Sequence, residues 1–583
     1  MADYTAPLAD MRFALDTIAG LPQLAELPSF AHAAPDLVEA VMAGAAKFAS
    51  EVIAPLNAIG DKQGSRLENG VVRTPDGFKE AYAAYVEGGW NALAFSEEIG
   101  GQGLPRALNL AVTEMWTSAS MAWMLNPLLT VGAVEALDIH GSDDLKRKYL
   151  GKLVSGEWTG SMNLTEPQAG SDVGAMRTRA TRDGDHYRIK GQKIFITYGE
   201  HDLTPNIVHM VLARSPDGPP GTAGLSLFLI PKFLVNDDGS LGARNDLRAV
   251  SLEHKLGVHA SPTCVMAYGD NEGAIGWLVG EENRGMECMF TMMNSARLQV
   301  GLQGLAIAER AYQQARDFAK TRVQGRPITA TGAGDFPIAY HPDVKRMLLS
   351  MRSRTEAMRA LIYYTAASID RAQHDPDAAA RARHQARADL LIPVVKAWCT
   401  DQGVAIASLG VQIHGGMGFI EETGAAQYYR DARIAPIYEG TNGIQANDLV
   451  GRKVQRDGGA AAVALIAEMR DAARGHAMLT AGIDALEDAT KWLVANARER
   501  ALTLSGAVPY LDLMGIVTGG WLLALEAAEA KRRLDAQVGD ASFNQAKRAT
   551  ARFYDAHLLA TAPALLPAIK GGETVLEFAM EAL

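Results

Sequence analysis

The sequence is poor in features that mark several large classes of protein. Its 583 residues include three cysteines, Cys264, Cys288 and Cys399, and no CxxC pair. So sparse a set excludes a disulfide-stapled fold and a cysteine-ligated zinc site, and it is typical of a reducing compartment. The uncharged apolar stretch most worth testing as a membrane span, residues 513–525, has 13 residues. Because this is too short to span a bilayer, we expect a buried helix and no membrane insertion.

Positive charge is also in short supply. The chain carries 56 basic and 67 acidic residues, a net charge of −11. A broad footprint on a phosphate backbone is therefore not expected, and neither is a nucleic-acid partner. The opening MADYTAPLAD has no basic segment followed by an apolar run. No signal peptide is indicated, so we expect a cytoplasmic protein.

Common ligand-binding motifs are missing as well. The sequence has no HExxH, EF-hand loop, GxxxxGK[ST] or GxSxG. The glycine-rich stretches at 100–104 and 415–419 do not complete GxGxxG after a strand. We therefore expect no metal site and no Rossmann dinucleotide site.

The chain divides by its periodicity. Only 160–285 is rich in short β-branched or aromatic runs; we count five strands, with a hairpin around Gly191-Gln192 in 187–197. Without intervening helices these strands indicate a β-barrel or sandwich. Alanine-rich helical segments precede this window and helices follow it, with a linker expected at 451–459. The predicted units are 1–159, 160–285, 286–455 and 456–583.

Three segments carry residue types that suit a polar ligand. LTEPQAGSDVG at 164–174 offers hydroxyls and amides around a turn, although its composition favours an ordinary surface turn. Glu439 lies between apolar residues and Gly440, where restricted solvent access would make it a general base; most glutamates are instead solvated. QIHGGMGF at 412–419 permits close backbone approach, or caps a helix.

The order of these segments along the chain is more specific than any one of them. LTEPQAGSD, KIFIT at 193–197, a Gly-x-x-x-Ser stretch at 257–261, QIHGGMGF, RDARI and IYEGTNGIQ follow one another. Together, over about 40–453, they resemble the acyl-CoA dehydrogenase family. The resemblance implies a mostly α fold with a helical domain, a central β-barrel and a four-helix bundle, here followed by a C-terminal helical extension. It also implies FAD, held in part by a neighbouring subunit of a homodimer or homotetramer.

The resemblance assigns roles to individual positions. Leu164 and Thr165 are implied at the flavin pyrimidine, Thr197 near N5, and Phe195 over the flavin in place of the commoner Trp. Arg322 is implied at the pyrophosphate and Thr441 at the phosphates. Glu439 is the implied catalytic base. The remaining positions are Gln412, Gly415 and Gly416 for the adenosine side, Ser171 for flavin or acyl-CoA, and Arg297, Tyr438 and Gly440 for substrate.

The implied reaction is α,β-dehydrogenation of an acyl-CoA to the trans-2-enoyl-CoA. Glu439 would take the α-proton while flavin N5 takes the β-hydride, and electron-transferring flavoprotein would reoxidise the flavin. Hydrogen bonds to the thioester carbonyl would acidify the α-proton. Alternatives on the same scaffold are an acyl-CoA oxidase and a non-catalytic flavoprotein that binds nucleic acid.

Two features depart from the common pattern. Arg322-Val-Gln-Gly325 lacks the aromatic of the usual R-x-x-F-G, which leaves the local flavin packing open. The chain also continues for about 130 residues past the shared region. That length and the opening sequence most resemble the bacterial subgroup that contains 3-methylmercaptopropionyl-CoA dehydrogenase. A short- or medium-chain acyl-CoA, or 3-methylthiopropanoyl-CoA, is therefore the expected substrate.

Overall fold

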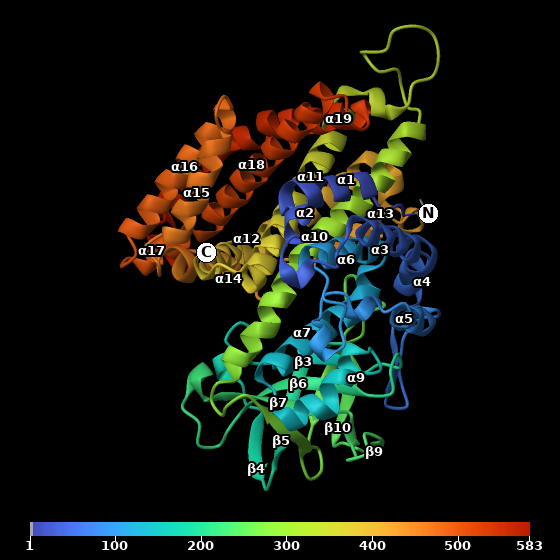
Figure 1. The fold of residues 1–583 in the computed structure, drawn as a ribbon, viewed down its shortest axis with the longest axis vertical. Helices are drawn as coiled ribbons and strands as arrows, with labels where there is room; N and C mark the ends of the chain where they lie inside the picture. The colour runs from blue at the N-terminus through green and yellow to red at the C-terminus, as the bar shows by residue number, and fades with distance from the viewer. Residues whose placement is uncertain (1–3, 583) are drawn as a thin grey trace. The chain divides into compact units, whose positions relative to one another are not determined.

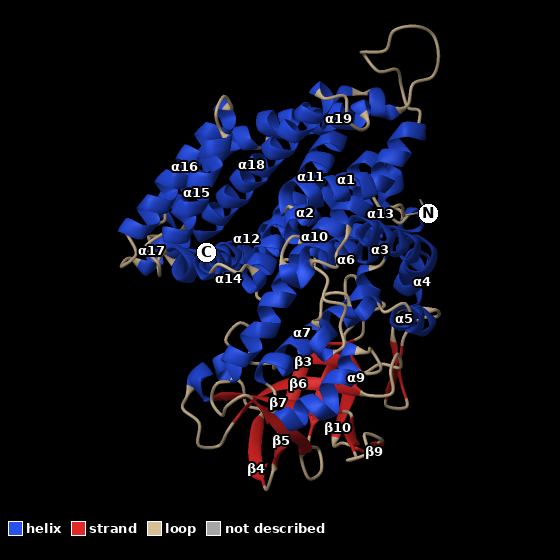
Figure 2. Cartoon of the chain, viewed as in Figure 1, coloured by secondary structure: helices blue, strands red, loops and turns tan. Residues whose placement is uncertain are grey.

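The computed structural model describes residues 4–582. The chain forms two compact units. The helical unit comprises Met1–Lys47, Pro105–Ser118 and Arg297–Leu583, and the β-containing unit comprises Phe48–Leu104 and Ala119–Ala296. The sheet strands all belong to the second unit (Figure 2). The expectation of a mostly helical protein with one β-rich region is confirmed.

The β-containing unit is built on a barrel-like sheet of eight strands, more than the five that the sequence indicated. Strand β3 escaped notice because four of its five residues, TGSMN, are small or polar, although every one is buried. The sheet order is β10-β11-β5-β12-β7-β6-β3, with β4 paired to β5 and β6. The strands are β1 Arg66–Glu68, β2 Val71–Arg73, β3 Thr159–Asn163, β4 Arg179–Asp183, β5 His186–Thr197, β6 Ile207–Arg214, β7 Leu225–Pro231, β8 Phe233–Val235, β9 Leu241–Arg244, β10 Leu247–Leu252, β11 Thr263–Tyr268 and β12 Ala274–Val279.

The hairpin expected at Gly191-Gln192 is wrong, because β5 runs through this position as one strand of 12 residues. The strand changes partners instead of turning: its first half pairs with β4 and β12, and its second half with β11. Gly191 is required by close approach, since a Cβ there would lie 2.3 Å from Thr178 Oγ1. The glycine that suggested a turn marks a crowded point in the sheet.

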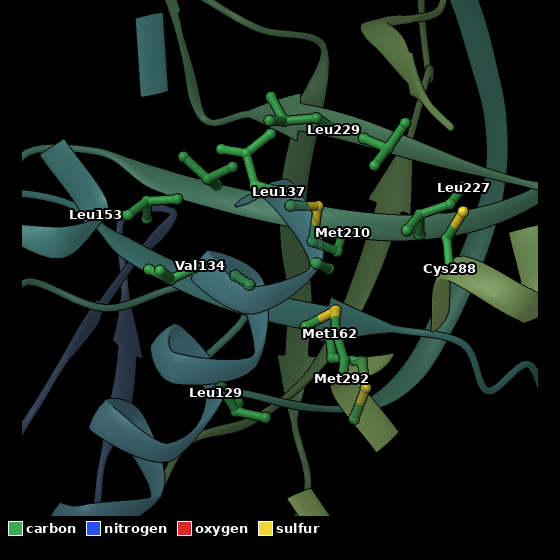
Figure 3. Packing of buried hydrophobic residues seen from close by; sticks show 14 of the residues in the cluster. Leu129, Val134, Leu137, Leu153, Met162, Met210, Leu227, Leu229, Cys288 and Met292 are labelled. Atoms are coloured by element: carbon green, nitrogen blue, oxygen red, sulfur yellow. The ribbon is translucent and has the colours of Figure 1, made fainter. Parts of the chain in front are cut away.

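One face of this sheet packs against helix α7, Met121–His140. Figure 3 shows Leu129, Val134 and Leu137 of α7 beside Met210 and Leu229 of the strands. Met292 lies in the same cluster and is 1% exposed, as expected of a core methionine rather than of a pocket wall. The other helices of this unit are α4 Ala54–Gln63, α5 Phe78–Glu87, α8 Asp143–Leu145 and α9 Gly151–Val154.

The helical unit contains three long helices, α10 (Gly285–Thr321), α11 (Pro342–His374) and α12 (Ala378–His414). The C-terminal helices pack onto α11 and α12. Figure 1 shows α15, α16 and α18 lying side by side in the orange and red part of the chain. Its helices are α1 Leu8–Ala14, α2 Leu21–Leu24, α3 Pro35–Phe48, α6 Arg106–Ala119, α10 Gly285–Thr321, α11 Pro342–His374, α12 Ala378–His414, α13 Ala425–Ala432, α14 Asn442–Asp448, α15 Ala460–Ala472, α16 Ala477–Ala495, α17 Arg500–Ser505, α18 Ala507–Asp535, α19 Ala541–His557, α20 Leu566–Lys570 and α21 Glu573–Leu576.

The stretch expected to be a linker, 451–459, is helical as far as Val454 and then turns into α15. Within the described residues, two segments are long and apolar enough to cross a membrane: Ala378–Phe419 and Ala507–Asp535. Their most apolar windows are 78% and 67% buried inside the protein, however. We therefore assign both to the core of the helical unit, as the sequence indicated for residues 513–525.

The C-terminal extension joins the bundle through close packing and buried charge. In α18, Gly515 lies against the ring of Trp398 on α12, and a Cβ there would lie 2.4 Å from Trp398 Cγ. In α19, buried Lys547 pairs with Glu356 of α11 at 2.9 Å and with Glu526 of α18 at 2.6 Å. Burial lowers the pKa of an ammonium, but these carboxylates outweigh it and raise the pKa of Lys547. The extension is thus an integral part of the helical unit.

The contact at Gly515 gives a stability prediction. The Gly515→Ala change should lower the free energy of unfolding by about 1–3 kcal/mol, because the added methyl must displace Trp398. The matched control is Gly451→Ala, where nothing lies within 4 Å of the added methyl. Denaturant unfolding of both variants measures the difference. Equal stabilities would show that the extension does not pack tightly on α12.

Candidate active site

The candidate base, Glu439, lies in the turn between α13 and α14 and has an unusual backbone. Its φ is 57°, in the left-handed region, and that of Gly440 is 83°. Such a conformation costs a non-glycine residue roughly 1–2 kcal/mol, so surrounding contacts must maintain it. The side chain is half-buried. The alternative of a fully solvated loop glutamate does not hold.

Two side chains anchor this turn through its carbonyl groups. Lys396 Nζ, from α12, donates to Gly440 O at 2.8 Å and to Asn442 Oδ1 at 2.9 Å. Gln445 Nε2, from α14, donates to Glu439 O at 3.2 Å. The Thr441 hydroxyl accepts from Ile444 N at 3.3 Å and so caps α14. The turn is fixed on both sides of Glu439.

The electrostatic surroundings of Glu439 combine burial with nearby cations. Burial raises the pKa of its carboxyl group, and Arg297 and Lys396 offset part of this rise. Arg297, 5% exposed, pairs with Asp448 Oδ2 at 3.3 Å. The Tyr438 hydroxyl donates to Gln303 Oε1, and burial raises the pKa of Tyr438. Glu439, Arg297, Tyr438, Gly440 and Thr441 are thus brought together in the helical unit.

The β-containing unit holds a second group of candidate residues. Buried Glu166 accepts from Lys193 Nζ at 2.9 Å and from the amides of Arg177 and Thr178 at 2.6 and 3.0 Å. Burial opposes ionisation of Glu166, but Lys193 and these donors lower its pKa to about 2. Lys193 Nζ also donates to Leu164 O at 2.8 Å. The pair fixes the 164–178 segment against β5.

Phe195 lies within this anchored strand, two residues after Lys193. It lies at a bulge in the pairing of β5 with β11, has a φ of 59° and leaves 58% of its side chain exposed. An amide from Ile194 donates to Thr165 O at 2.9 Å, so Leu164 and Thr165 lie beside it. Thr197 is half-buried at the end of the strand. Bulges commonly re-aim a side chain, here an aromatic ring flanked by hydroxyl and peptide groups.

Other predicted residues lie away from these groups. Ser171 is exposed in a turn before the short helix at 173–175, as the surface-turn alternative suggested. Gln412, Gly415 and Gly416 are exposed at the end of α12, where Gly415 is the C-cap. Sixteen residues separate Lys396 from Gln412, about 24 Å along the helix. Arg322, just past the end of α10, lies 25 residues after Arg297, about 38 Å along the helix direction.

The family models match nearly the whole chain in sequence order. Residues 36–157, 161–270 and 283–454 match the N-terminal, middle and C-terminal domains of acyl-CoA dehydrogenase. The chain belongs to the acyl-CoA dehydrogenase family. Residues 460–579, the extension, match a model described as acetyl-CoA dehydrogenase C-terminal like.

Individual relatives agree with this membership. The chain is 50% identical to the 3-methylmercaptopropionyl-CoA dehydrogenase of Ruegeria pomeroyi, over 95% of this chain and 96% of that one. Two solved structures share the fold at 20% identity. The Caenorhabditis elegans ACDH-11 complex with C11-CoA has a TM-score of 0.75 and covers 100% of this chain and 97% of that one. The Bacillus anthracis acyl-CoA dehydrogenase with FAD has a TM-score of 0.72, covering 95% and 90%.

The protein is therefore an FAD-dependent oxidoreductase of the acyl-CoA dehydrogenase type. The residues of the β-containing unit fit a flavin: an exposed aromatic ring, Phe195, stands beside the peptide groups of Leu164 and Thr165 and near the Thr197 hydroxyl. A flat heteroaromatic with polar edges requires this mixture of a stacking surface and hydrogen-bonding groups.

Three residues of these sites were missed as functional candidates. Glu166 and Lys193 each stand inside a segment singled out from the sequence, but their pairing across 27 positions carries no local signal. Lys396 lies within an apolar run, LIPVVKAW, where one charged residue in a core helix was the only available sign. Such a lysine needs buried polar partners, and those partners were not identifiable before the fold was known.

The Glu166–Lys193 pair gives a prediction for the flavin side. Glu166→Gln should destabilise the β-containing unit by about 3–5 kcal/mol, because it leaves the Lys193 ammonium buried without its carboxylate. The amount of bound FAD should fall together with this stability. A double-mutant cycle of Glu166→Gln and Lys193→Met measures the coupling energy between the two side chains. Denaturant unfolding gives the stability of each variant, and flavin absorbance gives its bound FAD. Additive effects of the two changes would contradict the assigned role of the pair.

Proposed function

We propose that the protein dehydrogenates an acyl-CoA thioester between Cα and Cβ, with Glu439 as the base that removes the α-proton. The observation that carries this proposal is the Glu439 turn: a half-buried carboxyl group with a raised pKa, held in a left-handed backbone and flanked by two cations. A general base works best when its pKa lies nearer the working pH than an ordinary carboxylate's.

Other groups of the chain are placed to assist this proton transfer. Within residues 4–582, the Glu439 amide donates to no backbone carbonyl, which leaves it free to bind the thioester carbonyl and stabilise charge that develops there. Arg297 and Lys396 stabilise the carboxylate form of Glu439 before it takes the proton. When bound beside these residues, FAD would supply the two-electron oxidation that accompanies loss of the α-proton.

We assign the flavin-facing roles to Leu164, Thr165, Phe195 and Thr197, which the β-containing unit brings together. Ser171, Tyr438 and Gly440 complete the proposed contacts with flavin or substrate. Gln412, Gly415, Gly416 and Arg322 lie at helix ends, many ångströms along α12 and α10 from the Glu439 turn. That separation supports their proposed role at the FAD of a neighbouring subunit in a homodimer or homotetramer. Electron-transferring flavoprotein is the proposed electron acceptor.

The proposed substrate is 3-methylthiopropanoyl-CoA or an unbranched acyl-CoA of similar length. Support comes from the R. pomeroyi relative, whose name specifies 3-methylmercaptopropionyl-CoA and which is 50% identical along almost the entire chain. A thioether is close to a methylene in size and polarity, so a pocket that accepts one also accepts the other.

The role of Glu439 gives the first catalytic prediction. Glu439→Gln should bind FAD normally and slow the bleaching of flavin absorbance by acyl-CoA by roughly 10²–10⁴-fold, because the amide cannot accept the α-proton. The control is Glu422→Gln, an exposed glutamate of the same unit, which should bleach at the wild-type rate. Anaerobic stopped-flow absorbance makes the measurement. Undiminished bleaching in Glu439→Gln would overturn the assignment of the base.

Substrate choice gives a second prediction. With an artificial electron acceptor, kcat/KM should be highest for 3-methylthiopropanoyl-CoA, butanoyl-CoA and pentanoyl-CoA, and should fall for chains of twelve or more carbons. Without the acceptor, hydrogen peroxide should form much more slowly than product forms when the acceptor is present. A maximum at long chains would contradict the proposed substrate, and peroxide formed without the acceptor as fast as product forms with it would identify an oxidase.

A further inference from the structure

We propose that Lys396 is a positioning residue for the reaction: from the core of α12 it holds the Glu439 turn in its reactive conformation and supplies positive charge beside the base. This inference rests on the proposed role of Glu439. It is carried by the contacts of Lys396 with Gly440 and Asn442, which lie on either side of Thr441 in that turn.

The buried position of Lys396 is energetically unfavourable for a charged amine, which indicates a role beyond packing. Its side chain is 0% exposed, on a helix that packs against α11, α13, α14 and α18. Its hydrogen-bond acceptors are the Gly440 carbonyl and the Asn442 side-chain oxygen, both neutral. Burying a charged amine without a directly bonded carboxylate is unfavourable. Other buried lysines here, Lys193 and Lys547, have carboxylates within 3 Å.

The contact geometry explains how Lys396 acts on Glu439. A left-handed residue followed by left-handed Gly440 directs the Gly440 carbonyl toward α12, where Nζ binds it at 2.8 Å. Asn442 extends the same attachment, since its Nδ2 donates to Ala397 O at 3.1 Å and to Thr400 Oγ1 at 3.0 Å. The turn is therefore tied to one face of α12 at several points. Removing the ammonium breaks the hydrogen bond to Gly440 O, which is the attachment to α12 nearest to Glu439.

Charge provides the second part of the role. The groups that bear on Glu439 are Lys396 from α12 and Arg297 from α10, which itself pairs with Asp448 of α14. Asp401 of α12 raises the pKa of Lys396 and also that of Asp512 on α18. Tyr438 and Asp431 lie on the chain leading into the turn. The described surroundings thus place two cations near the base.

The direction of the pH effect follows from these groups. Burial lowers the pKa of Lys396 to about 7, so the ammonium is charged below that pH. A charged Lys396 favours the carboxylate and lowers the pKa of Glu439. Without it the carboxylate forms only at higher pH. The acid limb of the rate profile should therefore move upward when the charge is removed.

The test compares Lys396→Met, which removes charge and hydrogen bonds, with Lys396→Gln, which removes charge but keeps a donor. In the FAD-loaded enzyme, Lys396→Met should lower kcat about tenfold and shift the acid limb of kcat/KM upward by about one pH unit. Lys396→Gln should have a higher kcat than Lys396→Met, but the same upward shift of the acid limb. Cys399→Ala, a buried change on the same helix, should leave the limb in place.

Two outcomes would overturn the proposal. If both Lys396 variants keep the wild-type acid limb, or lose activity only in proportion to lost FAD, Lys396 has a purely structural role. If Lys396→Met fails to fold, the limb in Lys396→Gln decides the question alone. Failure of the Lys396 inference can be distinguished from failure of the proposed function. If only the Lys396 inference is wrong, Glu439→Gln still stops flavin bleaching. If the base is misassigned, Glu439→Gln does not stop it.

Discussion

A carboxylate that removes a weakly acidic proton must be kept partly out of water without losing the negative charge that makes it a base. At Glu439, the proposed base, the structure combines half-burial, a left-handed backbone and two buried cations. Burial alone would hold the group protonated, and cations alone would make it a weak base. The helices that carry Arg297, Lys396 and Gln445 have to be rigid for this balance to persist.

The C-terminal extension contributes to that rigidity. Helix α18 packs against α12 and α14, the helices on which Lys396 and Gln445 stand. Gly515 allows α18 to approach the ring of Trp398, two residues from Lys396. Lys547 then joins α19 to α11 and α18 through buried carboxylates. The residues beyond the shared family region thereby support the helices around the base from outside the site.

Much of this organisation was predictable from the sequence, and the exceptions have physical causes. Collinear motifs identified the family, and they singled out Glu439 as the proposed base. The turn expected at Gly191 was wrong because glycine there serves close packing against Thr178. The contacts of Lys396 and of the Glu166–Lys193 pair join residues 44 and 27 positions apart, so only the folded chain brings them together.

The central claim, that Glu439 is the base, is tested most directly by separating proton transfer from oxidation. The CoA thioester of 3,3-dimethylbutanoic acid has α-protons but no β-hydrogen, so the enzyme can exchange its α-protons without oxidising it. In deuterated water, NMR should show α-deuterium entering faster with the wild-type holoenzyme than without enzyme, and at the background rate with Glu439→Gln. Equal enzyme-dependent exchange in the two proteins would contradict the account.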